Sequence, residues 1–142
     1  MKAWMAGVGL ASWIGVAAHA QSEWFTVSGD PTDAAANTVQ VDPIAIAVDG
    51  MSRTMNVRVN RSSTRLNWDK IAYRSYESQV LFDCQTRRAG YLQARYYTQP
   101  LWQGEPVATV DYTGDVRPML FRDIEPNPTG RLVRAACRTR TG

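Results

Sequence analysis

The stretch Val80–Tyr97, VLFDCQTRRAGYLQARYY, contains two alternating segments joined by a short basic turn. Alternate side chains of a β-strand point to opposite faces, so the first segment places Val80, Phe82 and Cys84 together on its apolar face. Gly90 begins the second segment, which alternates again. The stretch therefore predicts a β-hairpin whose first strand carries a cysteine on its buried side.

The compartment decides whether Cys84 can be oxidised, and the N-terminus has the pattern of a secretory signal peptide. Lys2 precedes an apolar run without charges at residues 3–16, and Ala-His-Ala at residues 18–20 supplies the small residues that a signal peptidase recognises. An uncleaved anchor is the alternative, but the run is shorter than the roughly 20 residues of a spanning helix. No cysteine follows the run as a site for lipid attachment. We expect cleavage after Ala20, and residues 21–142 as one periplasmic or secreted domain without a membrane span.

The chain contains two cysteines, and the second, Cys137, lies near the C-terminal end. An even number of cysteines in an exported chain predicts a disulfide between Cys84 and Cys137. Two free thiols are the alternative, and a redox-active pair would usually have the close CxxC spacing. Closing a loop of about fifty residues should stabilise the domain by roughly 4 kcal/mol.

Alternation of apolar and polar residues continues on both sides of the hairpin and predicts an antiparallel β-sheet of about six strands. A turn is expected at Asp49-Gly50, a sequence that favours tight hairpins. The expected strands are Trp24–Val27, Thr38–Val41 resuming after Asp42-Pro43 as Ile44–Val48, Thr54–Asn60, Tyr73–Thr86, Gly90–Tyr97 and Val107–Tyr112, with a further short strand within Asp115–Phe121. The segment Tyr73–Thr86 could form one long strand or two strands with a bend between them.

The period changes near the C-terminus, where a helix is expected. Asn127 is its predicted cap, and Pro128 its first residue. At helical spacing, one face collects Leu132, Val133, Ala136 and Cys137, and another collects Arg131, Arg134 and Arg138. Because Cys137 lies on the apolar face, the disulfide would tie the helix across the sheet. The expected fold class is α+β, an antiparallel sheet with a C-terminal helix tethered to one face.

The order of these elements along the chain resembles that of the surface-adhesin protein E family. The resemblance extends over residues 22–137, and its most specific part is the pair Asp83-Cys84 with Cys137. The segments that carry it are the opening Trp24, VDPIAI (41–46), SYESQVLFDCQTRR (75–88), ARYYTQPLWQGEP (94–106) and EPNPTGRLVRAAC (125–137). The resemblance implies a twisted antiparallel sheet with a disulfide-tied helix and an extracytoplasmic location. The namesake of the family adheres to host matrix proteins at the bacterial surface, so the resemblance also implies such adhesion here.

Catalytic chemistry has few candidates in this sequence. The only histidine, His19, leaves with the signal peptide, which excludes Ser-His-Asp and Cys-His arrangements and histidine metal sites. Paired carboxylates could perform glycosidase chemistry, but the pairs Asp111/Asp115 and Asp30/Asp33 flank turns, where aspartate is common for local hydrogen bonding. We expect a non-enzymatic protein without catalytic residues, metal or cofactor.

The candidate binding site is a basic and aromatic surface on the hairpin. Arginine and tyrosine are typical of protein-recognition patches, and arginine also binds anionic groups. The candidate residues are Arg87, Arg88, Tyr91, Arg95 and Tyr97, with the last three expected on the face opposite Leu92, Ala94 and Tyr96. A solvated sheet face in an arginine-rich protein is the alternative interpretation.

The expected partner is an extracellular matrix protein or an anionic glycan. Tyrosines with arginines also occur in single-stranded nucleic-acid binders, but export argues against nucleic acid. A periplasmic structural or envelope-associated protein without a host ligand is the competing hypothesis. An exposed sheet edge would also allow a homodimer.

Overall fold

The computed structural model describes residues 23–138, and the expected signal peptide at residues 1–20 lies outside the described residues. The described chain consists mainly of β-strands and ends in an α-helix. In chain order, the elements are β1 (Phe25–Ser28), β2 (Thr38–Val41), β3 (Ala47–Asp49), β4 (Ser52–Leu66), β5 (Ala72–Asp83), β6 (Arg88–Tyr97), the 3-10 helix η1 (Pro100–Trp102), β7 (Ala108–Asp111), β8 (Arg117–Pro118) and α1 (Thr129–Cys137).

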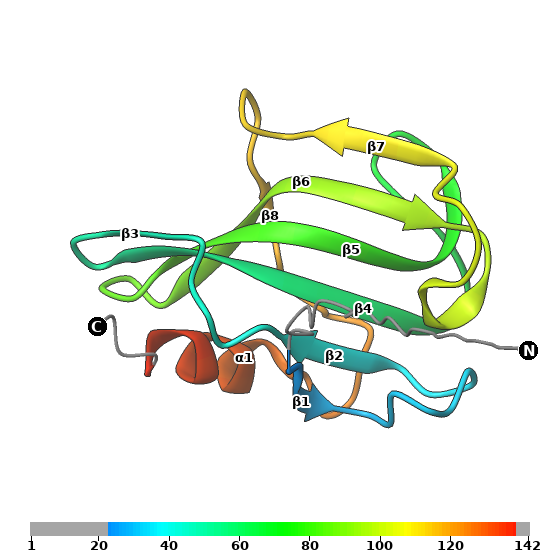
Figure 1. Cartoon of the computed structure of the whole chain (residues 1–142), viewed down its shortest axis with the longest axis horizontal. Coiled ribbons are helices and arrows are strands. Elements are labelled where there is room, and N and C mark those ends of the chain that lie inside the picture. Colours follow the sequence, from blue (N-terminus) through cyan, green and yellow to red (C-terminus); the bar gives the residue numbers. More distant parts are fainter. Residues whose placement is uncertain (1–22, 139–142) are drawn as a thin grey trace, which may run out of the picture.

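The strands form one antiparallel sheet in the order β1-β2-β4-β5-β6-β7 (Figure 1). Two short strands lie off this path, because β3 pairs with β4 and β8 pairs with β6. The predicted α+β fold is therefore confirmed, and β3 and β8 bring the sheet to eight strands.

The long hairpin β4–β5 forms the centre of the sheet and follows from the alternation in both strands. Met55 and Val57 are fully buried, and they lie opposite Val80 and Ser78. We call the face that carries these side chains the inner face, and the opposite one, to which Asn56 points, the outer face. The alternation of buried and half-buried residues along β4 shows that one side of the sheet faces a core.

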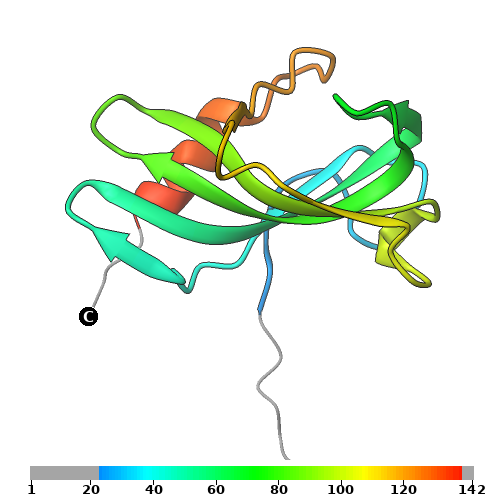
Figure 2. The same ribbon diagram turned by 90° about the horizontal axis from the view of Figure 1, so that it is seen from above.

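The helix α1 covers part of the inner face by packing against β1, β2, β4 and β5, as Figure 2 shows from above. Its buried residues are Leu132, Val133 and Ala136, and burying one leucine stabilises a fold by about 1.5–3 kcal/mol. The Cys84–Cys137 disulfide, with a Cα–Cα distance of 5.6 Å, ties the end of the helix to the end of β5. The predicted tether is confirmed.

The helix begins one residue later than expected, at Thr129 rather than Pro128. The Oδ1 atom of Asn127 accepts hydrogen bonds from the backbone N–H of Thr129 at 2.9 Å and from its hydroxyl at 2.7 Å. Asn127 therefore still supports the first turn, because the first N–H groups of a helix lack partners within it.

The strand predicted at Ile44–Val48 begins later than expected, at Ala47. The strand is β3, Ala47–Asp49, and Ile44 and Val48 are 72% and 42% exposed. Asp42 accepts a hydrogen bond from the backbone of Ile44 at 3.0 Å, so the chain turns there instead of extending. Val48 then pairs with Arg53, a charged rather than an apolar residue.

Candidate binding surfaces

The structure separates the five predicted site residues into three places. Arg87 and Arg88 are exposed at the β5–β6 turn, whereas Arg95 lies seven residues further along β6. At about 3.3 Å per residue, that spacing separates Arg88 from Arg95 by roughly 20 Å. Arg95 and Tyr97 remain together on the outer face, where Tyr97 is buried with 5% exposure, and Tyr91 lies on the inner face.

A β-bulge is the reason that Tyr91 changes face. Gln79 pairs with Gln93, but the next residue of β5, Val80, pairs with Tyr91, so that Leu92 is left unpaired. An extra residue in one strand inverts the alternation on one side of it. Tyr91 is consequently buried, with 5% exposure, and the expectation that it shares a face with Arg95 and Tyr97 is wrong.

On the outer face, Glu77 links the two remaining candidates. Its Oε1 atom accepts a hydrogen bond from the Tyr97 hydroxyl at 2.6 Å and another from Nη2 of Arg95 at 3.1 Å. The hydrogen bond to Glu77 raises the pKa of Arg95, and burial together with Glu77 raises the pKa of Tyr97. The Arg95 side chain is still 52% exposed, so a positioned guanidinium remains open to a partner.

A second arginine of the outer face lies between two indole rings. The guanidinium carbon of Arg58 is 3.9 Å from the ring centroid of Trp102 and 4.6 Å from that of Trp24. Burial lowers the pKa of Arg58, and the charge of Glu77 opposes this effect. Its Nε atom donates a hydrogen bond of 2.7 Å to Gln40. This stack brings Trp24, which directly precedes β1, and Trp102 of η1 onto Arg58 of β4 and so orders this part of the outer face.

Trp102 is held in place by its own hydrogen bonds. Its indole N–H donates to the carbonyl oxygens of Val59 and Tyr76 at 3.2 and 3.0 Å. Its φ of 59° lies in the left-handed region that non-glycine residues rarely adopt. These contacts fix the indole against Arg58.

Beside Arg95 the outer face forms a depression of about 320 Å³. Large polar side chains line it and supply both hydrogen-bond donors and acceptors. The main ones are Asn56, Glu77, Gln79, Gln93 and Arg95, with Trp24 at one side. A surface of this composition suits contact with another macromolecule.

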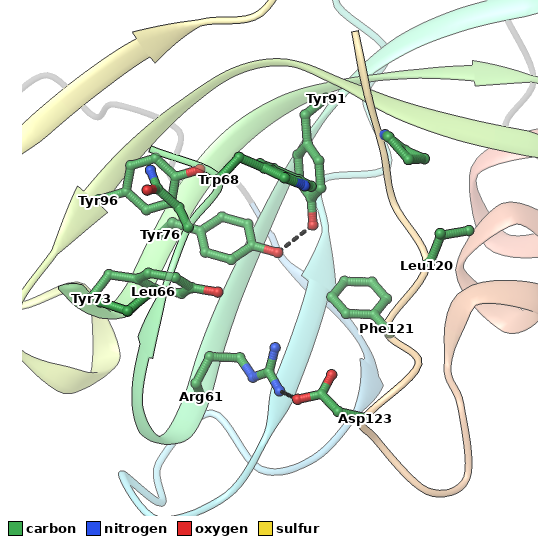
Figure 3. Close-up of a pocket in the computed structure, with 12 residues that line it drawn as sticks. Arg61, Leu66, Trp68, Tyr73, Tyr76, Tyr91, Tyr96, Leu120, Phe121 and Asp123 are labelled. Carbon is green, nitrogen blue, oxygen red and sulfur yellow. Dashed lines mark hydrogen bonds and ion pairs between the residues drawn. The ribbon is translucent and has the colours of Figure 1, made fainter. Parts of the chain in front are cut away.

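The inner face carries a second hollow beyond the helix, lined by aromatic side chains (Figure 3). Its volume is about 300 Å³. The hydroxyls of Tyr76 and Tyr91 hydrogen-bond to each other, and the Tyr73 ring lies 5.5 Å from that of Tyr76 and 5.1 Å from that of Tyr96. Trp68 packs edge-on against Tyr91 at 5.8 Å. We call this hollow the tyrosine pocket.

An arginine–aspartate pair lies at one side of the tyrosine pocket. Arg61, which is 7% exposed, forms an ion pair with Asp123, and Arg65 contacts the same carboxylate at 2.6 Å. Burial acts to raise the pKa of Asp123, but the hydrogen bond and charge of Arg61 and the charge of Arg65 prevail and lower it. Two guanidinium groups thus share one carboxylate, which leaves this side of the pocket positive.

Residues 24–138 match the sequence model of the family described as Surface-adhesin protein E. The chain belongs to the surface-adhesin protein E family. The resemblance found in the order of the segments is thereby confirmed. No curated protein and no solved structure is similar enough to count as a match.

Membership of the protein E family indicates an exported or surface adhesin. Within residues 23–138, no helix has the length and apolar character needed to span a membrane. Over the same residues, no group of three or more histidine, cysteine, aspartate or glutamate side chains could hold a metal ion.

The carboxylates considered for catalysis have local roles in this protein E family member. Asp111 accepts hydrogen bonds from the N–H and the hydroxyl of Thr113 at 2.8 and 2.7 Å, which lower the pKa of Asp111. Asp30 makes the same two contacts with Thr32 at 2.9 and 2.7 Å. Both aspartates therefore support turns, as the turn interpretation predicts.

Sequence reasoning missed two features of this protein E family member. The Trp24–Arg58–Trp102 stack joins residues from three distant segments, and no spacing rule connects them. The tyrosine pocket depends on the bulge at Leu92, without which Tyr91 would face outward. The abundance of tyrosine, six residues in this chain, was the one available signal.

Proposed function

We propose that this protein E family member is an exported, non-enzymatic adhesin that binds a host matrix protein through the outer face of its sheet. The observation that supports this most strongly is the half-exposed guanidinium of Arg95, which Glu77 positions beside Tyr97 on a polar face opposite the helix. Arginine, tyrosine and tryptophan dominate the binding energy of protein interfaces.

The composition of the outer face favours a protein as the partner. Long polar side chains line its depression, whereas small-molecule sites are lined mostly by apolar side chains. Glu77 and the Trp24–Arg58–Trp102 stack hold the charged groups in place before binding. Preorganised side chains lose less conformational entropy on binding, which strengthens an interface of a given area.

An anionic glycan is the second candidate partner, and the tyrosine pocket favours it. The pocket offers aromatic ring faces and neutral phenol hydroxyls, because burial raises the pKa values of Tyr76 and Tyr91 far above neutrality. The two positive charges of Arg61 and Arg65 exceed the single negative charge of Asp123. These groups suit one ring of an acidic sugar, with its carboxylate toward the arginines.

The experiment compares adherence of intact source cells to surfaces coated with matrix proteins. Cells that lack the chain should adhere less, and restoring the chain should restore adherence. Restoring the chain with the substitution Arg95→Ala should not restore adherence. Digestion of the chain by protease added outside intact cells would place it at the surface. Protection from that protease until the outer membrane is opened, with adherence unchanged by deletion, would instead support a periplasmic structural protein.

A further inference from the structure

A third hollow lies between β1 and α1, on the side of the helix that faces the edge of the sheet. Its volume is about 500 Å³, which is within the range of sites that hold part of a lipid or a small molecule. Apolar side chains form most of its walls, among them Phe25, Val27, Val41, Pro43 and Ala135. We call it the helix groove.

Three arginines of α1 line the helix groove. Arg131, Arg134 and Arg138 follow one another at spacings of three and four residues, which places them on one side of a helix. All three are exposed. None of the ion pairs found within residues 23–138 includes any of them, and no acidic residue lines the groove. Among the described residues that line it, this apolar hollow thus carries three positive charges and no carboxylate.

Exposed apolar side chains lie at the rim of the helix groove. Phe25, at the edge strand β1, is 54% exposed, and Ile44, which directly follows the groove residue Pro43, is 72% exposed. Large apolar side chains beside a row of arginines are typical of surfaces that lie on a bilayer. The apolar groups enter the headgroup region, and the arginines pair with lipid phosphates.

We propose that the helix groove docks the protein on a bilayer that contains anionic phospholipid. The phosphate groups of the lipids pair with Arg131, Arg134 and Arg138, while Phe25 and Ile44 insert between the headgroups. The charge of the groove selects this occupant, because a zwitterionic surface would leave the arginines uncompensated. The groove lies on the helix side of the sheet, so the outer face stays accessible to a protein partner.

The test is sedimentation of residues 21–142 with vesicles of phosphatidylcholine, alone or mixed with phosphatidylglycerol. The protein should sediment with the mixed vesicles and should not sediment with vesicles of phosphatidylcholine alone. Each arginine near an anionic surface strengthens binding about fivefold, so the double variant Arg131→Gln/Arg134→Gln should lose about thirtyfold in affinity. Phe25→Ser keeps the charge and should lose about fivefold to tenfold. All these side chains are exposed, and circular dichroism should show an unchanged fold.

The matched control is Lys70→Gln/Arg122→Gln, which removes the same charge from exposed positions outside the groove. It should change vesicle affinity by less than about twofold, because distant surface charges are screened at physiological salt. Equal losses in the two double variants would show attraction by net charge alone and overturn the proposal. Failure of the wild-type protein to bind the mixed vesicles would also overturn the proposal. So would a lipid-free dimer that Phe25→Ser dissociates, because the groove would then be a contact between copies.

Discussion

The hydroxyl of Tyr97 donates a hydrogen bond of 2.6 Å to Glu77 on the outer face of the sheet. The two residues lie on neighbouring strands, and the same carboxylate oxygen holds Arg95. Glu77 thus determines the position of the one half-exposed guanidinium of this network, but it also offsets that charge. Loss of Glu77 should therefore weaken the binding of a partner that needs a positioned arginine. It should strengthen the binding of a partner that is attracted by positive charge.

The substitution Glu77→Gln tests which of these partners the outer face binds. The amide keeps the size of the side chain but removes its charge, so Arg95 loses most of its support. Binding of a matrix protein should weaken about threefold to tenfold, as for the loss of one ordinary hydrogen bond, because the amide oxygen can still accept from Arg95 but without the charge. Biolayer interferometry against an immobilised matrix protein would measure this. Stronger binding of the variant would instead indicate that the face attracts an anionic ligand.

The substitution Cys84→Ser tests the tether between sheet and helix. The disulfide closes a loop with a sequence separation of 53, and removing a native disulfide from a small exported domain costs about 2–5 kcal/mol. Urea unfolding in nonreducing buffer should show this loss, and Cys137→Ser should lose the same amount. Reduction of the wild-type protein is the control and should reproduce it. Variants as stable as the oxidised wild type would contradict a structural role for the disulfide.

The tyrosines make stability sensitive to alkaline pH. Burial raises the pKa values of Tyr76, Tyr91 and Tyr96 in the folded protein, whereas the unfolded chain has tyrosine pKa values near 10. The folded state then binds more protons, so its stability is fully present below about pH 10 and is lost as the pH rises toward the folded values. Tyrosinate absorbance should therefore appear together with the loss of circular dichroism. Reversible tyrosine ionisation near pH 10 in a protein that stays folded would contradict this prediction.

The substitution Trp68→Ala tests the tyrosine pocket as a glycan site. Trp68 packs edge-on against Tyr91 and Tyr112 at 5.8 and 5.6 Å, so its loss should reduce stability by about 1–3 kcal/mol. Calorimetry with a uronic-acid oligosaccharide should show at least a fivefold loss of affinity, if the sugar ring stacks there. Binding of a matrix protein to the outer face should not change, which makes it the internal control. Unaltered glycan affinity would contradict the assignment of the tyrosine pocket as a glycan site.

Local sequence patterns predicted those parts of the fold that depend on one strand or one helix at a time. The buried face of β4 and the partnership of Cys84 with Cys137 followed from alternation, helical spacing and the count of cysteines. Ile44 shows the limit of that reasoning. Its alternation is that of a strand, but Asp42 turns the chain there, and Ile44 is left 72% exposed.

The candidate site was harder to predict because it depends on contacts between distant segments. Arg95 and Tyr97 share the outer face as expected, since no irregularity separates them. Tyr91 does not, because one unpaired residue at position 92 inverts the alternation before it. Alternation alone cannot locate a bulge, because the extra residue is defined by the register of the partner strand.

The most direct test of the central claim, recognition of a matrix protein by the outer face, is the affinity of residues 21–142 for a panel of matrix proteins. Wild-type protein should be compared with Arg95→Ala and with Arg122→Ala, a control at an exposed arginine on the segment after β8. We predict that Arg95→Ala weakens binding at least about tenfold, as expected for a central interface arginine, while Arg122→Ala binds like the wild type. Equal affinities for all three proteins would contradict the assignment of the outer face.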